Sequence, residues 1–142
     1  MQLSTKARYA TRALVKLAAK YNEGPVKLKD IAESQEISLK YLEQVMFPLR
    51  VAGFVRTQKG SQGGYTLARE PQSISLLDIV ECVEGSIAPV DCTDNPEICD
   101  RIDTCATREA WVDLQKVIKK ELGRFSLADL AERQKIMDES VS

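Results

Sequence analysis

The fold of this chain is most constrained by two helix patterns that a three-residue turn separates. Apolar residues recur at helical spacing over 29–34, residues 35–37 form the turn, and Ser38 can cap a second helix that runs to about Ala52. Gly53 then supplies a helix stop. The pattern predicts a helix-turn-helix, and a helical hairpin that only packs is the plainer interpretation of these residues taken alone.

A glycine-rich hairpin pattern follows the second helix directly. Residues 54–57 alternate as a strand, KGSQGG at 59–64 predicts a turn, and residues 65–68 alternate as the returning strand. A helix-turn-helix followed by such a hairpin is a winged helix, which favours a fold that is mostly α with one small β-hairpin. We therefore predict a winged helix-turn-helix head, with a long dimerisation helix further along the chain.

A winged helix-turn-helix is suited to binding double-stranded DNA. The capped end of the second helix can enter the major groove, and the wing can reach phosphates or the minor groove. A carboxylate accepts a hydrogen bond from cytosine but repels phosphate, so we expect Glu43 to discriminate between sequences. The predicted DNA-binding side chains are Lys6 and Arg8 from the first helix pattern, Ser38, Lys40, Tyr41, Glu43 and Gln44 from the second helix of the motif, and Arg56, Lys59, Ser61 and Gln62 from the wing.

The charge of the chain is unevenly distributed. Residues 1–69 carry twelve Lys and Arg against five acidic residues, a net charge of +7, whereas residues 70–142 carry eight against sixteen, a net charge of −8. The two values give the net charge of −1 of the whole chain. A basic front suits a polyanion such as DNA, and an uneven surface without a partner is the alternative.

The first helix pattern begins with Ser4 as a cap and runs from Thr5 to about Lys20. Its apolar positions recur at helical spacing, and cationic side chains occupy the positions between them. A run interrupted in this way lacks both the apolar core of a signal peptide and the length of a membrane span. We therefore expect a cytoplasmic protein without a membrane partner.

Pro71 marks the boundary between two regions of a single structural domain. Residues 1–70 form the predicted winged helix-turn-helix DNA-binding region, and residues 71–142 form the predicted cysteine loop and dimerisation helix. A helix is expected over 76–84 at the start of the second region. Cys82 lies among apolar residues of this helix, so we expect it to be a small buried side chain.

Three cysteines lie in an acidic stretch, DCTDNPEICDRIDTC, that precedes the last long helix pattern. Six residues separate Cys92 from Cys99, and five separate Cys99 from Cys105. The dipeptide Asn95-Pro96 keeps this stretch out of a regular helix. Three thiolates at this spacing can converge on one iron or iron–sulfur centre, and the tight C-x-x-C knuckle that structural zinc usually uses is missing. We therefore predict a metal site at these cysteines.

A long amphipathic helix pattern follows the cysteines and ends at Gly123. Its apolar stripe has nowhere to pack outside a compact head, so a homodimer, helix against helix, is expected, and packing on its own head is the alternative. Ser126 can cap a short helix over 127–134 that would clasp the partner, and the polar end at 137–142 is expected to fray. The predicted dimer interface consists of Trp111, Leu114, Val117, Ile118 and Leu122.

The sequence resembles the Rrf2 family of winged-helix regulators along nearly the whole chain. The resemblance rests on STKARYATRAL at the start, ISLKYLEQVMFPLR in the helix-turn-helix, GFVRTQKGSQGGYTLAR in the wing, and DIVECVEG, the three cysteines and FSLADL beyond it. The IscR-like branch of this family consists of homodimers that sense iron–sulfur cluster supply and control cluster-assembly genes. The resemblance implies that Cys92, Cys99 and Cys105 bind the cluster, and that residues 38–44 and Lys59 read DNA.

Two residues depart from the patterns of this family. The IscR-like pattern has a histidine where this chain has Arg108, and the nitric-oxide-sensing branch can use an acidic ligand where this chain has Arg8. A guanidinium remains protonated and has no lone pair to donate to iron, so neither arginine can be the fourth ligand. The fourth ligand is expected among Asp91, Asp103, Glu109, Cys82, solvent or a small thiol, and the cluster type, 2Fe-2S or 4Fe-4S, stays open.

We thus expect a repressor that senses iron–sulfur cluster status and controls cluster-assembly, iron or redox genes. A second interpretation keeps the DNA binding and changes the signal. Cluster-free repressors of cysteine and sulfur metabolism in the same family respond through a partner protein or thiol oxidation, and PLRVAGFVR and VEGSIAPV are similar to that branch. An enzyme is disfavoured, because the chain has no histidine, no nucleophile paired with a base and no phosphate-binding loop.

Overall fold

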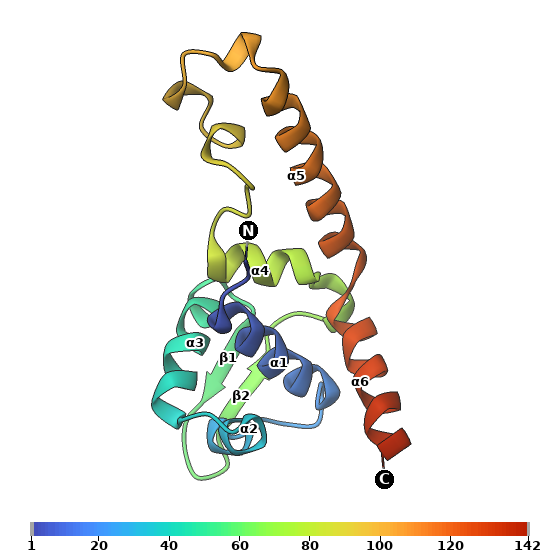
Figure 1. The fold of residues 1–142 in the computed structure, drawn as a ribbon. Coiled ribbons are helices and arrows are strands. Elements are labelled where there is room, and N and C mark those ends of the chain that lie inside the picture. Colours follow the sequence, from blue (N-terminus) through green and yellow to red (C-terminus); the bar gives the residue numbers. More distant parts are fainter. Residues whose placement is uncertain (1, 142) are drawn as a thin grey trace.

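The computed structural model describes residues 2–141. Within this range the chain forms six α-helices and one antiparallel hairpin, with short 3-10 turns between some of them (Figure 1). The predicted fold, mostly α with one small β-hairpin, is confirmed. The elements are α1 (Thr5–Ala19), α2 (Leu28–Gln35), α3 (Leu39–Val51), β1 (Val55–Gln58), β2 (Gly64–Leu67), α4 (Leu76–Glu84), α5 (Ala106–Arg124) and α6 (Leu127–Val141).

The helix-turn-helix consists of α2, a tight turn and α3. Glu36 ends α2 in the left-handed conformation, at φ 55°, and the Ile37 backbone N–H donates to the carbonyl of Ala32 at 3.1 Å. Ser38 is the N-cap of α3, because its hydroxyl oxygen accepts from the Tyr41 backbone N–H at 3.1 Å. The cap that the sequence predicts therefore fixes where α3, the predicted DNA-reading helix, begins.

The wing is the hairpin of β1 and β2, in which Val55 lies opposite Leu67. Two backbone hydrogen bonds between Val26 and Tyr65, of 2.9 and 2.8 Å, attach the hairpin to the segment before α2. Gly64 is needed at this contact, since a Cβ there would lie only 2.4 Å from the carbonyl oxygen of Val26. The glycine-rich turn thus also locks the wing against the helix-turn-helix.

One hydrophobic core lies beneath the helix-turn-helix and the wing. It collects apolar side chains from α1, α2, α3 and both strands. Ile74, Ile79 of α4 and Leu127 of α6 are fully buried in the same core. The core of the head therefore draws on residues before and after position 70.

The cysteine loop and α5 project from this head. The loop at 86–105 runs beside α5 and returns to its first turn, and α4 lies between the projection and the rest of the head (Figure 1). Contacts of α4 with α1, α3 and α5 join the two parts. The loop contains three short 3-10 turns, at 91–93, 96–98 and 102–104, as expected for a segment kept out of a regular helix.

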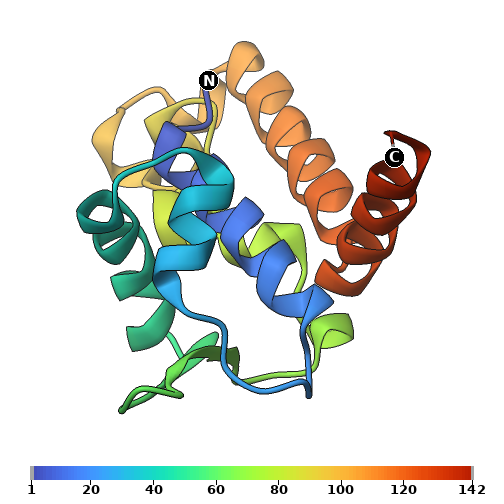
Figure 2. The same ribbon diagram turned by 90° about the horizontal axis from the view of Figure 1, so that it is seen from below.

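The last helix, α6, folds back along α1 of the same chain, on the side of the head away from α3 (Figure 2). Ser126 and Asp129 cap it reciprocally, with backbone-to-side-chain bonds of 3.1 and 3.0 Å. The helix continues to Val141, so the expectation of fraying was wrong for residues 137–141. Ser142 lies outside the described residues. The clasp with a partner stays a prediction. Over residues 2–141, no helix is both long and apolar enough to cross a membrane.

Candidate DNA-binding surface and cysteine loop

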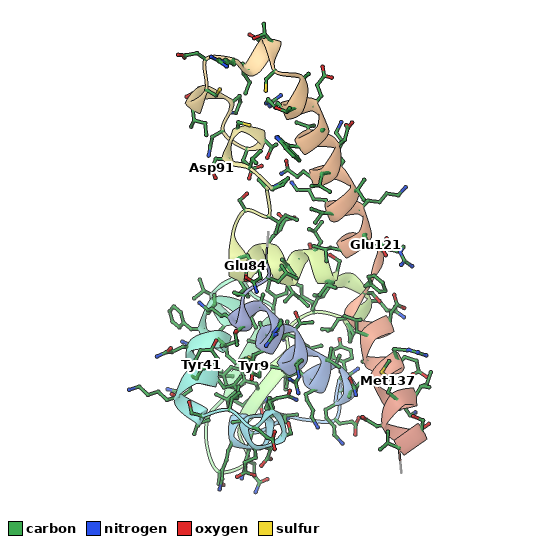
Figure 3. All side chains as sticks on the ribbon, in the orientation of Figure 1. Tyr9, Tyr41, Glu84, Asp91, Glu121 and Met137 are labelled. Atoms are coloured by element: carbon green, nitrogen blue, oxygen red, sulfur yellow. The ribbon has the colours of Figure 1, made fainter. Side chains whose placement is uncertain are left out.

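The reading helix α3 presents three of its predicted DNA-binding side chains to solvent. Lys40, Glu43 and Gln44 are exposed, opposite the face that packs into the core. Tyr41 is half-buried, and its ring meets the Tyr9 ring edge to face, with the centroids 6.0 Å apart (Figure 3). Tyr41 therefore also joins α3 to α1, a structural role that the sequence pattern alone did not reveal.

An open groove of about 700 Å³ separates α3 from the wing. Glu43 lines it from α3 together with Phe47 and Arg50, and Lys27 lines it from the segment before α2. Phe47 is 57% exposed, and the Arg50 guanidinium lies 5.6 Å from the centre of its ring. None of these neighbours of Glu43 is among the predicted DNA-binding side chains. For Phe47 and Arg50, the four- and three-residue spacing along one face of α3 is the signal that could have found them.

The predicted wing contacts occupy exposed positions beside this groove. The turn between the strands is closed by a hydrogen bond from the Gly63 N–H to the Gly60 carbonyl, at 3.0 Å. It thereby brings backbone amides and cationic side chains to one edge of the head. The exposed wing residues are Arg56, Lys59, Ser61 and Gln62.

The predicted contacts on α1 lie near its N-terminal end. Arg8 is exposed, and Lys6 is half-buried and close enough to Cys82 for its charge to act on that thiol. Further along α1, Arg12 and Lys16 line an open groove that α1 shares with α6. The basic positions of α1 thus face two environments, and the second half of the helix faces α6.

The three loop cysteines are free thiols, of which Cys99 is exposed and Cys92 and Cys105 are half-buried. Among residues 2–141, no three Cys, Asp, Glu or His side chains are gathered closely enough to hold a metal ion. The predicted convergence of the cysteines is therefore absent from this conformation. Three thiols in one loop remain donors of the kind that iron–sulfur clusters take, so the donor set suits the cluster and gathering it requires the loop to close.

The environments of two cysteines shift their ionisation in opposite directions. Cys105 is the N-cap of α5, and its pKa is lowered, first by the Thr107 hydroxyl 3.2 Å from its sulfur and then by the Arg108 backbone N–H. Burial raises the pKa of Cys82, whose thiol donates to the Pro48 carbonyl at 3.6 Å. Cys82 packs against the core from α4 but is only half-buried, so the small buried side chain expected from the sequence is borne out in part.

One part of the loop is fastened to α5. The Arg108 guanidinium donates from Nε to the backbone carbonyl of Cys92 at 3.3 Å. Gln115 donates from Nε2 to the Asp94 carboxylate at 2.8 Å, and the Ser86 hydroxyl donates to the other oxygen of that carboxylate. These hydrogen bonds lower the pKa of Asp94, with Ser86 contributing most. Arg108, at the position of the expected histidine, thus contacts the backbone of a predicted ligand residue.

The apolar stripe of α5 is largely uncovered in the single chain. Trp111 and Leu114 are exposed, and Val117 is 63% exposed. Ile118 and Leu122 are half-buried, at the end of the helix that contacts α4. Packing on its own head therefore covers only part of the stripe, and exposed apolar residues in a row mark an interaction surface.

A capped reading helix exposed on a helix-turn-helix, with a basic hairpin beside it, defines a winged-helix DNA-binding protein. The chain belongs to the Rrf2 family, because the family model, described as an iron-dependent transcriptional regulator, matches residues 3–133. It is therefore a transcriptional regulator and not an enzyme. The resemblance drawn from the sequence motifs is confirmed.

Relatives of two kinds are similarly close to this chain. It is 40% identical over 131 residues to the HTH-type transcriptional regulator CymR of Bacillus subtilis, covering 92% of this chain and 90% of the relative. It is 39% identical over 138 residues to the HTH-type transcriptional regulator IscR of Xenorhabdus nematophila, covering 97% and 84%.

Solved structures divide in the same way. CymR, the global cysteine regulator of B. subtilis, superposes with a TM-score of 0.80 at 38% identity, covering 94% of this chain and 98% of that chain. T. potens IscR superposes with a TM-score of 0.76 at 39% identity, covering 94% and 88%. The winged-helix fold is thereby confirmed, and the likeness does not separate the two kinds of relative.

Proposed function

We propose that the chain is a homodimeric repressor that binds promoter DNA and senses iron–sulfur cluster supply through Cys92, Cys99 and Cys105. The observation that carries the sensing role is the presence of three free thiols in one loop that ends at the first turn of α5. Thiolates are the usual ligands of iron–sulfur clusters. The similarity to IscR of X. nematophila supports the same choice.

DNA binding is proposed to occur through α3 and the wing together. The N-terminal half of α3 would enter the major groove, where Glu43 accepts from cytosine, and the exposed wing cation Lys59 would contact phosphate or the minor groove. The groove between them would then straddle a sugar–phosphate strand. Lys27 and Arg50 line that groove and supply the charge that a phosphate needs.

The homodimer is proposed to form through the apolar stripe of α5. Because Val117 is exposed in the single chain, Val117→Glu would place a charge in the helix-to-helix contact of each copy. Sedimentation equilibrium should then show a dimer dissociation constant raised by at least about tenfold, since each desolvated unpaired charge costs several kcal/mol. Lys120→Glu, at an exposed position of the same helix, is the control. Equal dimerisation of both variants would remove this stripe from the interface.

Signal transfer is proposed to depend on where the loop ends. A bound cluster would connect the loop thiols, and this connection would depend on iron supply and on oxidants. Residues 92–105 would be held in one conformation by ligation, and α5, which starts at the last cysteine, would carry that difference to the paired heads. The balance between two arrangements of the heads on DNA would shift accordingly.

The deciding experiment is the visible absorption spectrum of protein purified without oxygen, together with its iron and acid-labile sulfide content. A brown protein containing both elements is the expected result. Colourless protein that resists reconstitution with iron and sulfide yet binds DNA would overturn the cluster assignment and leave the DNA-binding assignment in place.

The second candidate is a cluster-free repressor that responds to thiol oxidation or to a partner protein. Two observations favour it: the thiols are not gathered in this conformation, and the similarity to B. subtilis CymR is about as high as that to X. nematophila IscR. Metal-free protein that loses DNA affinity with hydrogen peroxide and regains it with dithiothreitol would support it. DNA affinity that depends on iron content and not on peroxide would exclude its redox form.

A further inference from the structure

The two arms of the cysteine loop are held very differently. We define the near arm as residues 86–95, which contain Cys92, and the far arm as residues 96–104, which contain Cys99. The near arm packs against α5. The far arm is exposed along its length except for a half-buried Ile102.

The near arm is fastened to α5 at two points. Gln115, on α5, is the one buried polar side chain in the part of the chain that the structure describes, at 9% exposed. A buried amide must find a partner, and its Nε2 donates to Asp94 at 2.8 Å. Seven residues earlier on α5, two helical turns away, Arg108 donates to the carbonyl of Cys92 at 3.3 Å. The Cys92 backbone and the Asp94 side chain, on the two sides of Thr93, are therefore both bonded to the helix.

The far arm lacks such attachment. Within residues 2–141, no side-chain hydrogen bond joins 96–104 to α5, and the Thr104 hydroxyl bonds only within the arm, to Arg101 at 3.5 Å. Its apolar Ile98 is 60% exposed. A segment with few buried contacts opens and moves at low free-energy cost.

We infer that Asp94, Gln115 and Arg108 are positioning residues that fix Cys92 beside the Cys105 end of α5, so that the site is completed by movement of the far arm alone. This inference rests on the proposed cluster-sensing function. It assigns Arg108 a task although a guanidinium cannot ligate iron. It also places both fastening points on the helix that carries the apolar stripe, at positions flanking Trp111 and Leu114. A change in the conformation of the near arm would therefore act directly on α5.

The first test uses reduced, metal-free protein and exchanges donor and acceptor. Gln115→Glu removes the donated hydrogen bond and sets two carboxylates face to face, whereas Asp94→Asn with Gln115→Glu restores an N–H···O bond with the roles reversed. We expect Gln115→Glu to raise iodoacetamide alkylation of Cys92 and amide exchange over 91–95 by about tenfold, and the double variant to return both to wild-type values. Cys99 should alkylate equally in all three proteins.

Two further variants keep this test decisive. Asp94→Asn alone retains the acceptor and is the matched control, expected to behave like wild type. Asp94→Ala removes the acceptor at an exposed position and should raise alkylation of Cys92 by the same factor. It therefore replaces Gln115→Glu in this test if a buried carboxylate at position 115 prevents folding. Unchanged alkylation and exchange in both Gln115→Glu and Asp94→Ala would overturn the inference.

The second measurement joins this inference to the cluster. During anaerobic reconstitution with iron and sulfide, Gln115→Glu should incorporate less iron per chain than wild type, and the double variant should recover it. Wild-type protein that binds no iron would refute the proposed cluster, while the alkylation and exchange results would still decide whether Cys92 is positioned by α5. If Gln115→Glu incorporates iron fully while its Cys92 alkylates faster, the hydrogen bond to Asp94 holds Cys92 but does not help cluster binding.

Discussion

The head and the far arm are built in opposite ways. In the head, α1 to α4, the wing and the start of α6 share one core, and the backbone at the base of the wing is packed so closely that Gly64 has no room for a Cβ. In the far arm no residue at 96–104 is buried. A surface that reads DNA needs side chains held at fixed positions, whereas a segment that responds to a signal needs two conformations of similar free energy. Under the proposed function, the chain places these two needs in different regions.

Substitution of the loop cysteines is the strongest test of this separation. Cys92→Ala, Cys99→Ala and Cys105→Ala should each abolish iron and sulfide binding, because each removes one of three thiolate ligands. The head should be unaffected, so the far-ultraviolet circular dichroism and the melting temperature of the metal-free proteins should match wild type. Cys82 is also a candidate for the fourth ligand, but its thiol bonds to the Pro48 carbonyl in the head. We therefore expect Cys82→Ala to keep the cluster, and loss of the cluster in this variant would instead make Cys82 the fourth ligand. A loop variant with full cluster content would remove that cysteine from the site.

Matched truncations of apolar side chains compare the two regions directly. Leu49→Ala, in the fully buried face of α3, should lower the free energy of unfolding by about 2–5 kcal/mol, because it removes buried methyl groups and leaves a cavity. Ile98→Ala, in the far arm, should change it by less than about 0.5 kcal/mol, because the side chain is 60% exposed. Urea unfolding of the two variants measures both values. A large loss in Ile98→Ala would mean that the far arm is packed and does not move freely.

The same contrast explains what the sequence could predict. Ser38, the apolar spacing of α3 and the glycines of the wing are local signals, and local signals determine where helices and turns begin and end. The hydrogen bond from Gln115 to Asp94 joins positions 21 residues apart in the chain, so no local sequence pattern predicts it. Phe47 was missed because an exposed apolar side chain on an amphipathic helix departs from the expected pattern. The polar end of α6 suggested fraying, yet the helix packs on α1 and continues to Val141.

Two side chains at the DNA-binding edge of the head should differ in what they contribute. Lys59→Ala should weaken binding to all DNA sequences and reduce the slope of log affinity against log salt by roughly 0.9, since one phosphate contact releases one counterion. Glu43→Ala should relax discrimination at one base pair by about 1–3 kcal/mol and leave the salt slope unchanged. Fluorescence anisotropy titrations on several operator variants at three salt concentrations separate these outcomes. Equal losses on every sequence for both variants would contradict this division of roles.

The smallest expected effect concerns ionisation at the junction of loop and helix. The pKa of Cys105 is lowered chiefly by the Thr107 hydroxyl, so at a pH below the ordinary thiol range more of Cys105 is thiolate than of Cys82, whose pKa burial raises. Alkylation of Cys105 should therefore rise at lower pH than that of Cys82. Thr107→Val should move the Cys105 profile to higher pH, and Thr107→Ser, which keeps a hydroxyl, should leave it in place. Identical profiles for wild type and Thr107→Val would show that the backbone amides at the start of α5 and the Arg101 charge lower the pKa of this thiol without the Thr107 hydroxyl.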